Sequence, residues 1–289
     1  MKPGSWPRRL RTAGLAILAM AALTCAFFYA ASERIVRRTF PAPTHQLVVP
    51  TDAASIAEGA RLARIRGCNE GCHGQQGITG RVLWEEPWIG RMVAPNLTEV
   101  VRRYSNAELE RAIRHGVRRD GRGLFEMPSD MFAHLDDHDL GAIIAFLRSE
   151  PRSDGPLAST SFGLLWRWEL IAGDPVAAAI TAGIDQDIPH PAREDHRDAL
   201  ANGRYLAMST CTECHAQDLT GEPGYSPALA IVAAYSPEDF TRLMRTGTAL
   251  GGREVGEPML TITRKRTPHF TDAELDDLYR FLRGLSHTD

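Results

Sequence analysis

Two short cysteine–histidine strings have the most specific spacing in this 289-residue chain. Residues 211–215 read Cys-Thr-Glu-Cys-His, the C-x-x-C-H pattern of covalent haem attachment. Two thiols one helical turn apart can each bond a porphyrin vinyl group, and the histidine that follows can ligate the iron. Residues 68–73 read Cys-Asn-Glu-Gly-Cys-His, with one extra residue between the cysteines. We expect thioether bonds at Cys68, Cys72, Cys211 and Cys214, and axial ligation by His73 and His215.

The extra residue in the first string is compatible with attachment. On a helix, a three-residue step falls about 60° short of a full turn and a four-residue step passes it by about 40°, so both cysteine pairs face one side. Gly71 could absorb a local bulge. A redox dithiol, half of a zinc site and a disulfide are the alternatives. None of them requires a histidine directly after the second cysteine, and this chain has one in both strings.

A haem held by one histidine needs a ligand on its other face, and in electron carriers methionine is a frequent choice. Met127 and Met259 lie at matched distances, within a residue, after a glycine that ends a predicted helix. We expect them to be the two distal ligands. The alternatives are other methionines, expected to fill the core, and histidines that have no counterpart in the other half. These residues are Met92, Met131, Met244, His134, His138 and His269.

An internal repeat surrounds the two strings and predicts an all-α fold with two tandem domains. A helix should precede each string, a capped helix of equal length should follow it, and an apolar-periodic helix should end each copy. No convincing two-residue alternation predicts a strand. The matched segments are 59–63 with 203–207, 105–116 with 236–247, and 136–147 with 271–282. The domains are expected at residues 53–150 and 198–289.

The N-terminus is expected to be a transmembrane anchor over residues 1–33, with a linker at 34–52. Residues 13–31 carry no charge and follow four basic side chains, a pattern that spans a bilayer with the N-terminus inside the cell. A cleaved signal peptide is the competing interpretation. Either one exports the remainder, so we expect a bacterial inner-membrane protein with its haem domains in the periplasm.

Residues 151–197 are expected to link the two domains. They include an apolar island at 162–171, which predicts a short packed helix or a contact with a partner or the membrane surface. The net charge of −3 gives no reason to expect nucleic acid. Seven arginines between residues 102 and 122 indicate a solvated face or a docking patch for an acidic redox partner.

With these motifs in place, the chain resembles tandem class I cytochromes c. It is similar to the multihaem cytochrome c subunits that accept electrons from membrane-bound quinoprotein or flavoprotein alcohol and sugar-acid dehydrogenases. This resemblance implies histidine–methionine iron in each domain and supports Met127 over Met131. Such subunits often carry three haems, whereas this chain has two motifs. The residues that carry the resemblance are 94–98, 114–117, 121–123, 127–128, 139–140 and 146–147.

The expected function is electron transfer by two covalently attached haem c groups. Single electrons would pass between a membrane dehydrogenase or quinol-oxidising complex and a terminal oxidase or soluble cytochrome, with no small-molecule substrate transformed and no enzymatic activity. A dihaem peroxidase-like enzyme or a haem sensor is the alternative, and either would need one open iron site.

Overall fold

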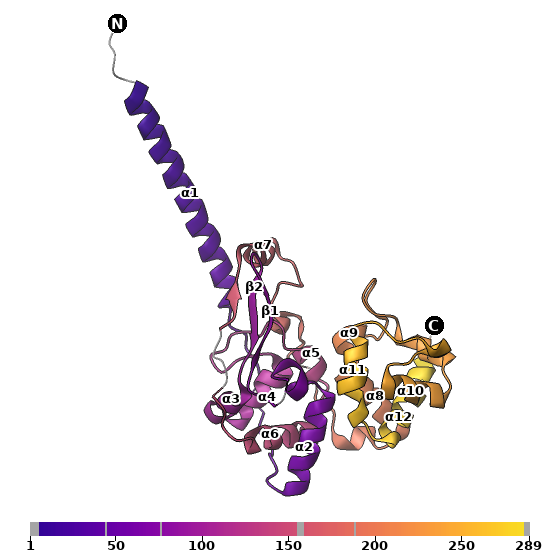
Figure 1. The fold of residues 1–289 in the computed structure, drawn as a ribbon. Coiled ribbons are helices and arrows are strands. Elements are labelled where there is room, and N and C mark those ends of the chain that lie inside the picture. Colours follow the sequence, from indigo (N-terminus) through magenta and orange to yellow (C-terminus); the bar gives the residue numbers. More distant parts are fainter. Residues whose placement is uncertain (1–5, 44, 76, 155–158, 188, 286–289) are drawn as a thin grey trace.

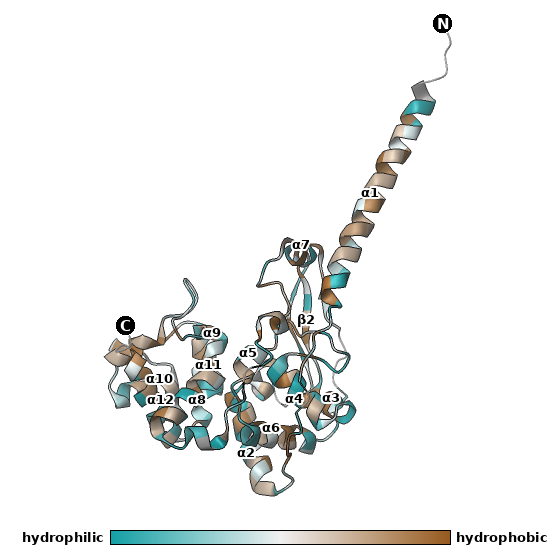
Figure 2. Ribbon diagram, turned by 180° about the vertical axis from the view of Figure 1, so that it is seen from behind, coloured by the Kyte–Doolittle hydropathy of each residue, from teal (hydrophilic) through white to brown (hydrophobic). Residues whose placement is uncertain are grey.

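A long N-terminal helix projects away from two helical lobes (Figure 1). The computed structural model describes residues 6–43, 45–75, 77–154, 159–187 and 189–285. Helix α1 (Trp6–Val36) contains the one candidate membrane span among these residues, Arg8–Val36, whose apolar window is not covered by the rest of the protein. Its length and composition suffice to cross a membrane, and a signal sequence meets the same criteria. Figure 2 shows hydrophobic colouring along most of the helix.

Each lobe is built on two long helices that cross at close range. Helix α2 lies against α6 in the first lobe, and α8 lies against α12 in the second. A Cβ on Gly59 would lie 1.9 Å from the carbonyl oxygen of Ala142, and a Cβ on Gly203 would lie 2.1 Å from that of Asp277. The two glycines are therefore needed for this backbone approach. The first lobe contains α2 (Ala53–Ile65), α3 (Leu97–Arg103), α4 (Asn106–His115), α5 (Ser129–Phe132) and α6 (Asp137–Ser149).

The second lobe repeats the plan of the first. Its helices are α8 (Ala199–Thr210), α9 (Thr212–His215), α10 (Pro237–Thr246), α11 (Met259–Lys265) and α12 (Asp272–Gly284). Short helical turns complete the chain: the π-helix η1 (Cys68–Cys72) and the 3-10 helices η2 (Ile180–Gly183), η3 (Arg193–His196), η4 (Leu229–Ala234), η5 (Leu250–Gly252) and η6 (Thr267–His269).

The predicted helix ends are confirmed. Each is set by the side chain or glycine at the helix terminus. Ser105 forms a capping box at the start of α4, and Thr271 forms one at the start of α12. Ser236 caps α10, whose first residue is proline. Gly116 and Gly247 end α4 and α10 with left-handed backbone angles, which glycine adopts at no steric cost.

A small antiparallel sheet departs from the sequence-based expectation of no strands. It has the order β1 (Arg81–Glu86), β2 (Gly90–Ala94), β3 (Ser161–Phe162). The register shifts between Val82 and Trp84, so the side chains of β1 do not alternate regularly between buried and exposed. A broken period leaves no sequence signal. The fold is nonetheless mostly helical, as predicted.

The apolar island forms helix α7 (Leu164–Ala172), as predicted, and packs against the sheet and α1. Trp166 is buried beside Trp84 and Phe162. Arg167 connects this unit to the base of α1. Its guanidinium donates to the Ser32 hydroxyl at 2.9 Å, pairs with the Glu33 carboxylate at 3.0 Å and lies over the Tyr29 ring.

Buried polar contacts join the two lobes. Arg61 donates two hydrogen bonds of 2.8 Å to the Glu274 carboxylate, one from each terminal nitrogen. The Tyr205 hydroxyl donates to Asp139 at 2.7 Å. His196, which stacks on the Tyr205 ring, contacts the Asp136 carboxylate of the first lobe at 2.8 Å. Because these groups lose water at the interface, each needs its partner across it.

Candidate haem sites

The extra residue of the first cysteine string lies in a π-helical turn. The Cys72 amide donates to the Gly67 carbonyl and the His73 amide to the Cys68 carbonyl, both five residues back. A π turn accommodates one residue more than an α turn. The predicted local bulge at this string is therefore present, and Gly71 lies within it.

The second string follows the ordinary spacing. Helix α8 ends at Thr210, and the short α9 begins directly afterwards. The His215 amide donates to the Cys211 carbonyl at 3.0 Å, which is the α-helical interval. The first string therefore forms a π-helical turn and the second an α-helical turn, and in both the histidine directly follows the second cysteine.

Both histidines are oriented by a proline carbonyl at the same place in each repeat. Nδ1 of His73 lies 3.0 Å from the Pro95 oxygen, and Nδ1 of His215 lies 2.8 Å from the Pro227 oxygen. A carbonyl only accepts, so Nδ1 carries the hydrogen and Nε2 holds the lone pair. Burial lowers the pKa of both histidines, although the hydrogen bond opposes it. Each imidazole is thus oriented with Nε2 free of that hydrogen bond, as a metal ligand requires.

The thiols lie in apolar surroundings. Cys68 packs against the core of the first lobe and Cys211 against that of the second. Burial raises the pKa of both to about 11. Burial also raises the pKa of Cys72 and Cys214. Reactive redox dithiols have a lowered pKa, so these buried pairs do not fit that alternative.

The candidate methionines divide by packing. Met127 and Met259 are half-buried and touch the same apolar cores as Cys68 and Cys211 respectively. Met131 is fully buried and enclosed by core side chains. Met92 packs with the sheet and Met244 is a core residue of the second lobe.

The candidate histidines have other contacts. His134 lies 3.3 Å from the Gln217 side chain, and His138 is exposed and contacts Asp139. The His269 carbonyl accepts a hydrogen bond from Arg61 at the lobe interface.

One residue that the sequence analysis missed lies between the two strings. Arg266 pairs with Glu213, inside the second string, at 2.6 Å. Its other terminal nitrogen lies 4.0 Å from the Cys72 sulfur in the first string. Arg266 follows α11 and carries no sequence motif, so only the packing of the lobes reveals this position.

The side chains present fit covalently bound haem c. Each lobe packs one cysteine and one half-buried methionine against its apolar core and holds the next histidine by a proline carbonyl; thioether attachment with histidine and methionine on iron would use these side chains. The two proline carbonyls supply the hydrogen-bond acceptors that such histidines require.

Comparison with protein families agrees with this chemistry. Residues 200–286 match the family model described as cytochrome c. Residues 54–147 match the model described as cytochrome c oxidase, cbb3-type, subunit III.

Curated relatives match across both lobes. The fructose dehydrogenase cytochrome subunit of Gluconobacter japonicus is 25% identical over 274 residues, covering 84% of this chain and 55% of the relative. The cytochrome c subunit of the quinone alcohol dehydrogenase of Gluconacetobacter polyoxogenes is 25% identical over 282 residues, covering 81% and 56%. The gluconate 2-dehydrogenase cytochrome c subunit of Pantoea cypripedii is 30% identical over 175 residues, covering 56% and 38%.

The chain spans just over half the length of the first two of these relatives. Cytochrome c domains imply covalently bound haem c, and both matched segments contain one of the cysteine–histidine strings. The chain therefore carries two cytochrome c domains and is homologous to the cytochrome c subunits of membrane-bound dehydrogenases.

Proposed function

We propose that this chain is a dihaem electron carrier held at the outer face of a bacterial inner membrane. One haem would be bound by Cys68 and Cys72, and the other by Cys211 and Cys214. The carrier would accept single electrons from a membrane-bound dehydrogenase or quinol-oxidising complex and deliver them to a terminal oxidase or soluble cytochrome. Domain limits of 53–150 and 198–289 belong to the same proposal.

The repeated histidine geometry is the observation that carries the proposal. In both lobes a proline carbonyl holds the imidazole by Nδ1 and leaves Nε2 for iron. Bound haem c supplies the one-electron redox centre. The chain's own residues fix the ring orientation, exclude water with apolar packing and supply the second axial ligand, proposed as Met127 for His73 and Met259 for His215.

Membrane attachment is supported by the surroundings of α1. The C-terminal end of α1 contacts α7. Two exposed tryptophans lie on this part of the first lobe: Trp88 is 69% exposed and Trp168 is 61% exposed. Tryptophan favours the interface between lipid and water. We place α7 at that interface, with the lobe outside the cytoplasm.

Haem count and iron closure are the first tests. The denatured chain should stain for haem and exceed its polypeptide mass by two haem groups. Cys211→Ala should lower haem incorporation in the second lobe and Cys68→Ala in the first. The oxidised and reduced spectra of the intact protein should not change on adding carbon monoxide. Stoichiometric carbon monoxide binding would instead favour the peroxidase-like enzyme or sensor.

The partner is tested in membranes that contain the chain. Addition of an alcohol, a sugar or a sugar acid should reduce its haems when the matching dehydrogenase is present. Loss of substrate-driven electron flow to oxygen on deleting the gene for the chain, with dehydrogenase activity toward an artificial dye retained, supports the carrier role. Unchanged electron flow to oxygen in the deletion strain contradicts it.

A further inference from the structure

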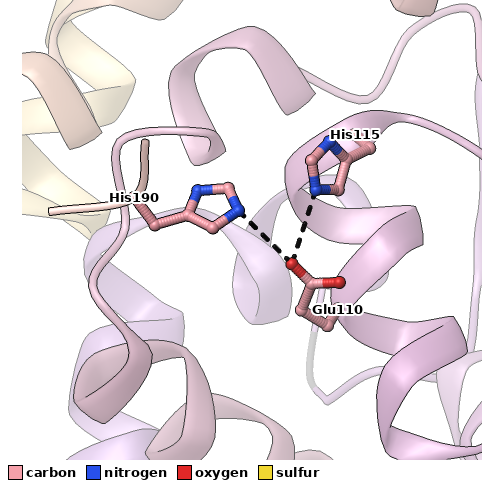
Figure 3. Close-up of side chains that lie close together, drawn as sticks. All are labelled: Glu110, His115 and His190. Atoms are coloured by element: carbon pink, nitrogen blue, oxygen red, sulfur yellow. Dashed lines mark ion pairs between the residues drawn. The ribbon is translucent and has the colours of Figure 1, made fainter. Parts of the chain in front are cut away.

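A buried carboxylate and two imidazoles converge at the end of α4, away from the cysteine strings. Glu110 is 0% exposed and His115 is 2% exposed, and both belong to α4. His190 comes from the segment that connects the two lobes. Figure 3 shows a nitrogen of each ring facing the same Glu110 oxygen. The Nε2 atoms of His115 and His190 lie 3.5 Å and 3.6 Å from Glu110 Oε1.

The hydrogen-bond partners of the rings fix their lone pairs. The Gln186 side-chain amide donates to the His115 carbonyl, so its oxygen faces His115 Nδ1 at 2.9 Å and accepts that nitrogen's hydrogen. His190 Nδ1 lies 3.4 Å from the Ala133 carbonyl, which also only accepts. Both Nε2 lone pairs therefore face a carboxylate oxygen. Three lone-pair donors that face one another repel unless a proton or a cation lies among them.

Two of the buried side-chain atoms that lack a hydrogen-bond partner belong to this group. Among the described residues, His115 Nε2 and Glu110 Oε2 are buried without a hydrogen-bond partner. A native interior rarely leaves such atoms unsatisfied. The unpartnered Nε2 of His115 faces the space between the two rings and Glu110 Oε1, whereas Oε2 is the oxygen on the other side of the carboxylate.

The charge balance leaves room for a cation. Arg114, which the sequence analysis placed in an arginine-rich stretch that could form a surface face, is fully buried. It lies 3.3 Å from Glu110 but makes shorter bonds, 2.7 Å to Asp137 and 2.8 Å to the Leu135 carbonyl. Arg114 is thus shared between Glu110 and Asp137, and Asp137 is also paired with His45 at 2.8 Å, so the buried Glu110 charge is only partly matched by Arg114.

We infer that Glu110, His115 and His190 form a binding site for a divalent transition-metal ion of the zinc class. Two neutral imidazoles and a carboxylate are a zinc donor set. Bonds of about 2.0–2.1 Å place tetrahedral ligand atoms about 3.3 Å apart, close to the observed separations. The three ligand atoms all lie within 4.8 Å of one another. A water molecule can take the fourth position, since the His190 side chain is 18% exposed.

A second group of potential metal ligands does not share these features. Asp136, His138 and Asp139 also lie close together. Their carboxylates are already bound by the His196 ring and the Tyr205 hydroxyl at the lobe interface. The comparison favours the Glu110 group, in which His115 Nε2 has no hydrogen-bond partner and Glu110 Oε1 accepts a long hydrogen bond of 3.3 Å from Arg114.

The proposed ion would fasten the connecting segment to the first lobe. Two ligands belong to α4, and the third belongs to the chain that leads into the second lobe. Metal binding would therefore stabilise the path between the two domains, separately from the iron chemistry.

The test uses the full, haem-loaded chain in detergent, treated with a chelator and titrated with zinc by calorimetry. We expect one zinc ion per chain. His190→Ala should weaken binding at least tenfold, and Gln186→Ala, which frees the His115 ring to turn, should weaken it about tenfold. The control is His134→Ala, a half-buried histidine of the same lobe outside the group, and it should bind zinc as the wild type does.

Zinc-edge X-ray absorption gives an independent readout, because the haem irons do not contribute to it. The spectrum should fit two imidazole nitrogens and one carboxylate oxygen. Equal zinc binding by wild type and His190→Ala, or no binding by the wild type at micromolar zinc, would overturn the inference. If His190→Ala fails to fold, Gln186→Ala decides with the same criterion.

Discussion

Arg266 offers a test of whether the two cysteine strings are electrostatically coupled. Its guanidinium pairs with Glu213 in the second string and approaches the Cys72 sulfur in the first. The side chains of Arg266 and Glu213 are only 17% and 25% exposed. A positive charge beside a haem favours the reduced form and raises the reduction potential. Arg266→Gln should therefore lower haem potential, and Glu213→Gln should raise it.

The magnitude follows from Coulomb's law. A unit charge about 10 Å from a redox centre, at an effective dielectric constant of about 20, is worth about 1.7 kcal/mol. For a one-electron couple this energy corresponds to about 70 mV. Partial solvent exposure screens the pair, so a shift of about 30–70 mV is expected for either single substitution. The double variant should return close to the wild-type potentials, because both charges are then absent.

The assay is a spectroelectrochemical titration of the intact protein at constant pH and ionic strength. Arg280→Gln is the control: Arg280 pairs with Asp276 at 2.7 Å on the exposed face of α12, and its loss should shift the potentials by less than about 10 mV. Shifts of the same sign in Arg266→Gln and Glu213→Gln, or shifts no larger than the control, would refute the coupling.

Three further outcomes are expected. Met127→His should lower the potential of one haem and remove its weak absorption band near the red edge of the visible spectrum, since imidazole favours oxidised iron. Met131→Leu is a core exchange that should leave both unchanged and cost less than about 1.5 kcal/mol in unfolding free energy; a lost band in Met131→Leu would reverse the assignment. The pKa of Asp139 is below its usual range because, although burial opposes ionisation, the nearby arginine charge and the Tyr205 hydroxyl outweigh it. Ionised Asp139 therefore stabilises the fold above the unfolded-state pKa of about 3.9, and this contribution is lost as the pH falls through the folded-state pKa. Tyr205→Phe should raise the folded-state pKa of Asp139, so the acid-dependent loss in thermal unfolding scans should be smaller and complete at a higher pH, whereas identical pH profiles would contradict the linkage. A chain lacking residues 1–37 should be recovered without detergent, while the full chain should sediment with membranes; release of the full chain by salt alone would argue against the anchor.

Local signals explain most of what the sequence predicted. Helix starts such as Ser105 and Thr271 need only partners three residues away, and the cysteine–histidine strings are contiguous. The small sheet gave no signal because the pairing of β1 is irregular and β3 has two residues. The roles assigned to the cysteines, His73, His215, Met127 and Met259 remain predictions.

Long-range contacts lie beyond sequence reasoning. Arg61 meets Glu274 only because α2 and α12 come together at the lobe interface. The approach of His190 to Glu110 similarly depends on the path of the connecting segment. Side chains that are far apart in sequence and carry no motif become partners through packing, so neither pair could be predicted from spacing.

The junction between α1 and the first lobe determines how the molecule would move on a membrane. The Arg167 contacts fix the base of the helix, and the Phe40 amide donates to the Gly121 carbonyl a few residues later. Little chain remains to bend between these points. If α1 spans the bilayer as proposed, these contacts hold the first lobe at a defined height and tilt relative to the membrane surface. Electron exchange would then depend on lateral diffusion and on a partner whose docking surface lies at the same height above the membrane. Lengthening the junction with glycine and serine residues would allow partners with docking surfaces at other heights.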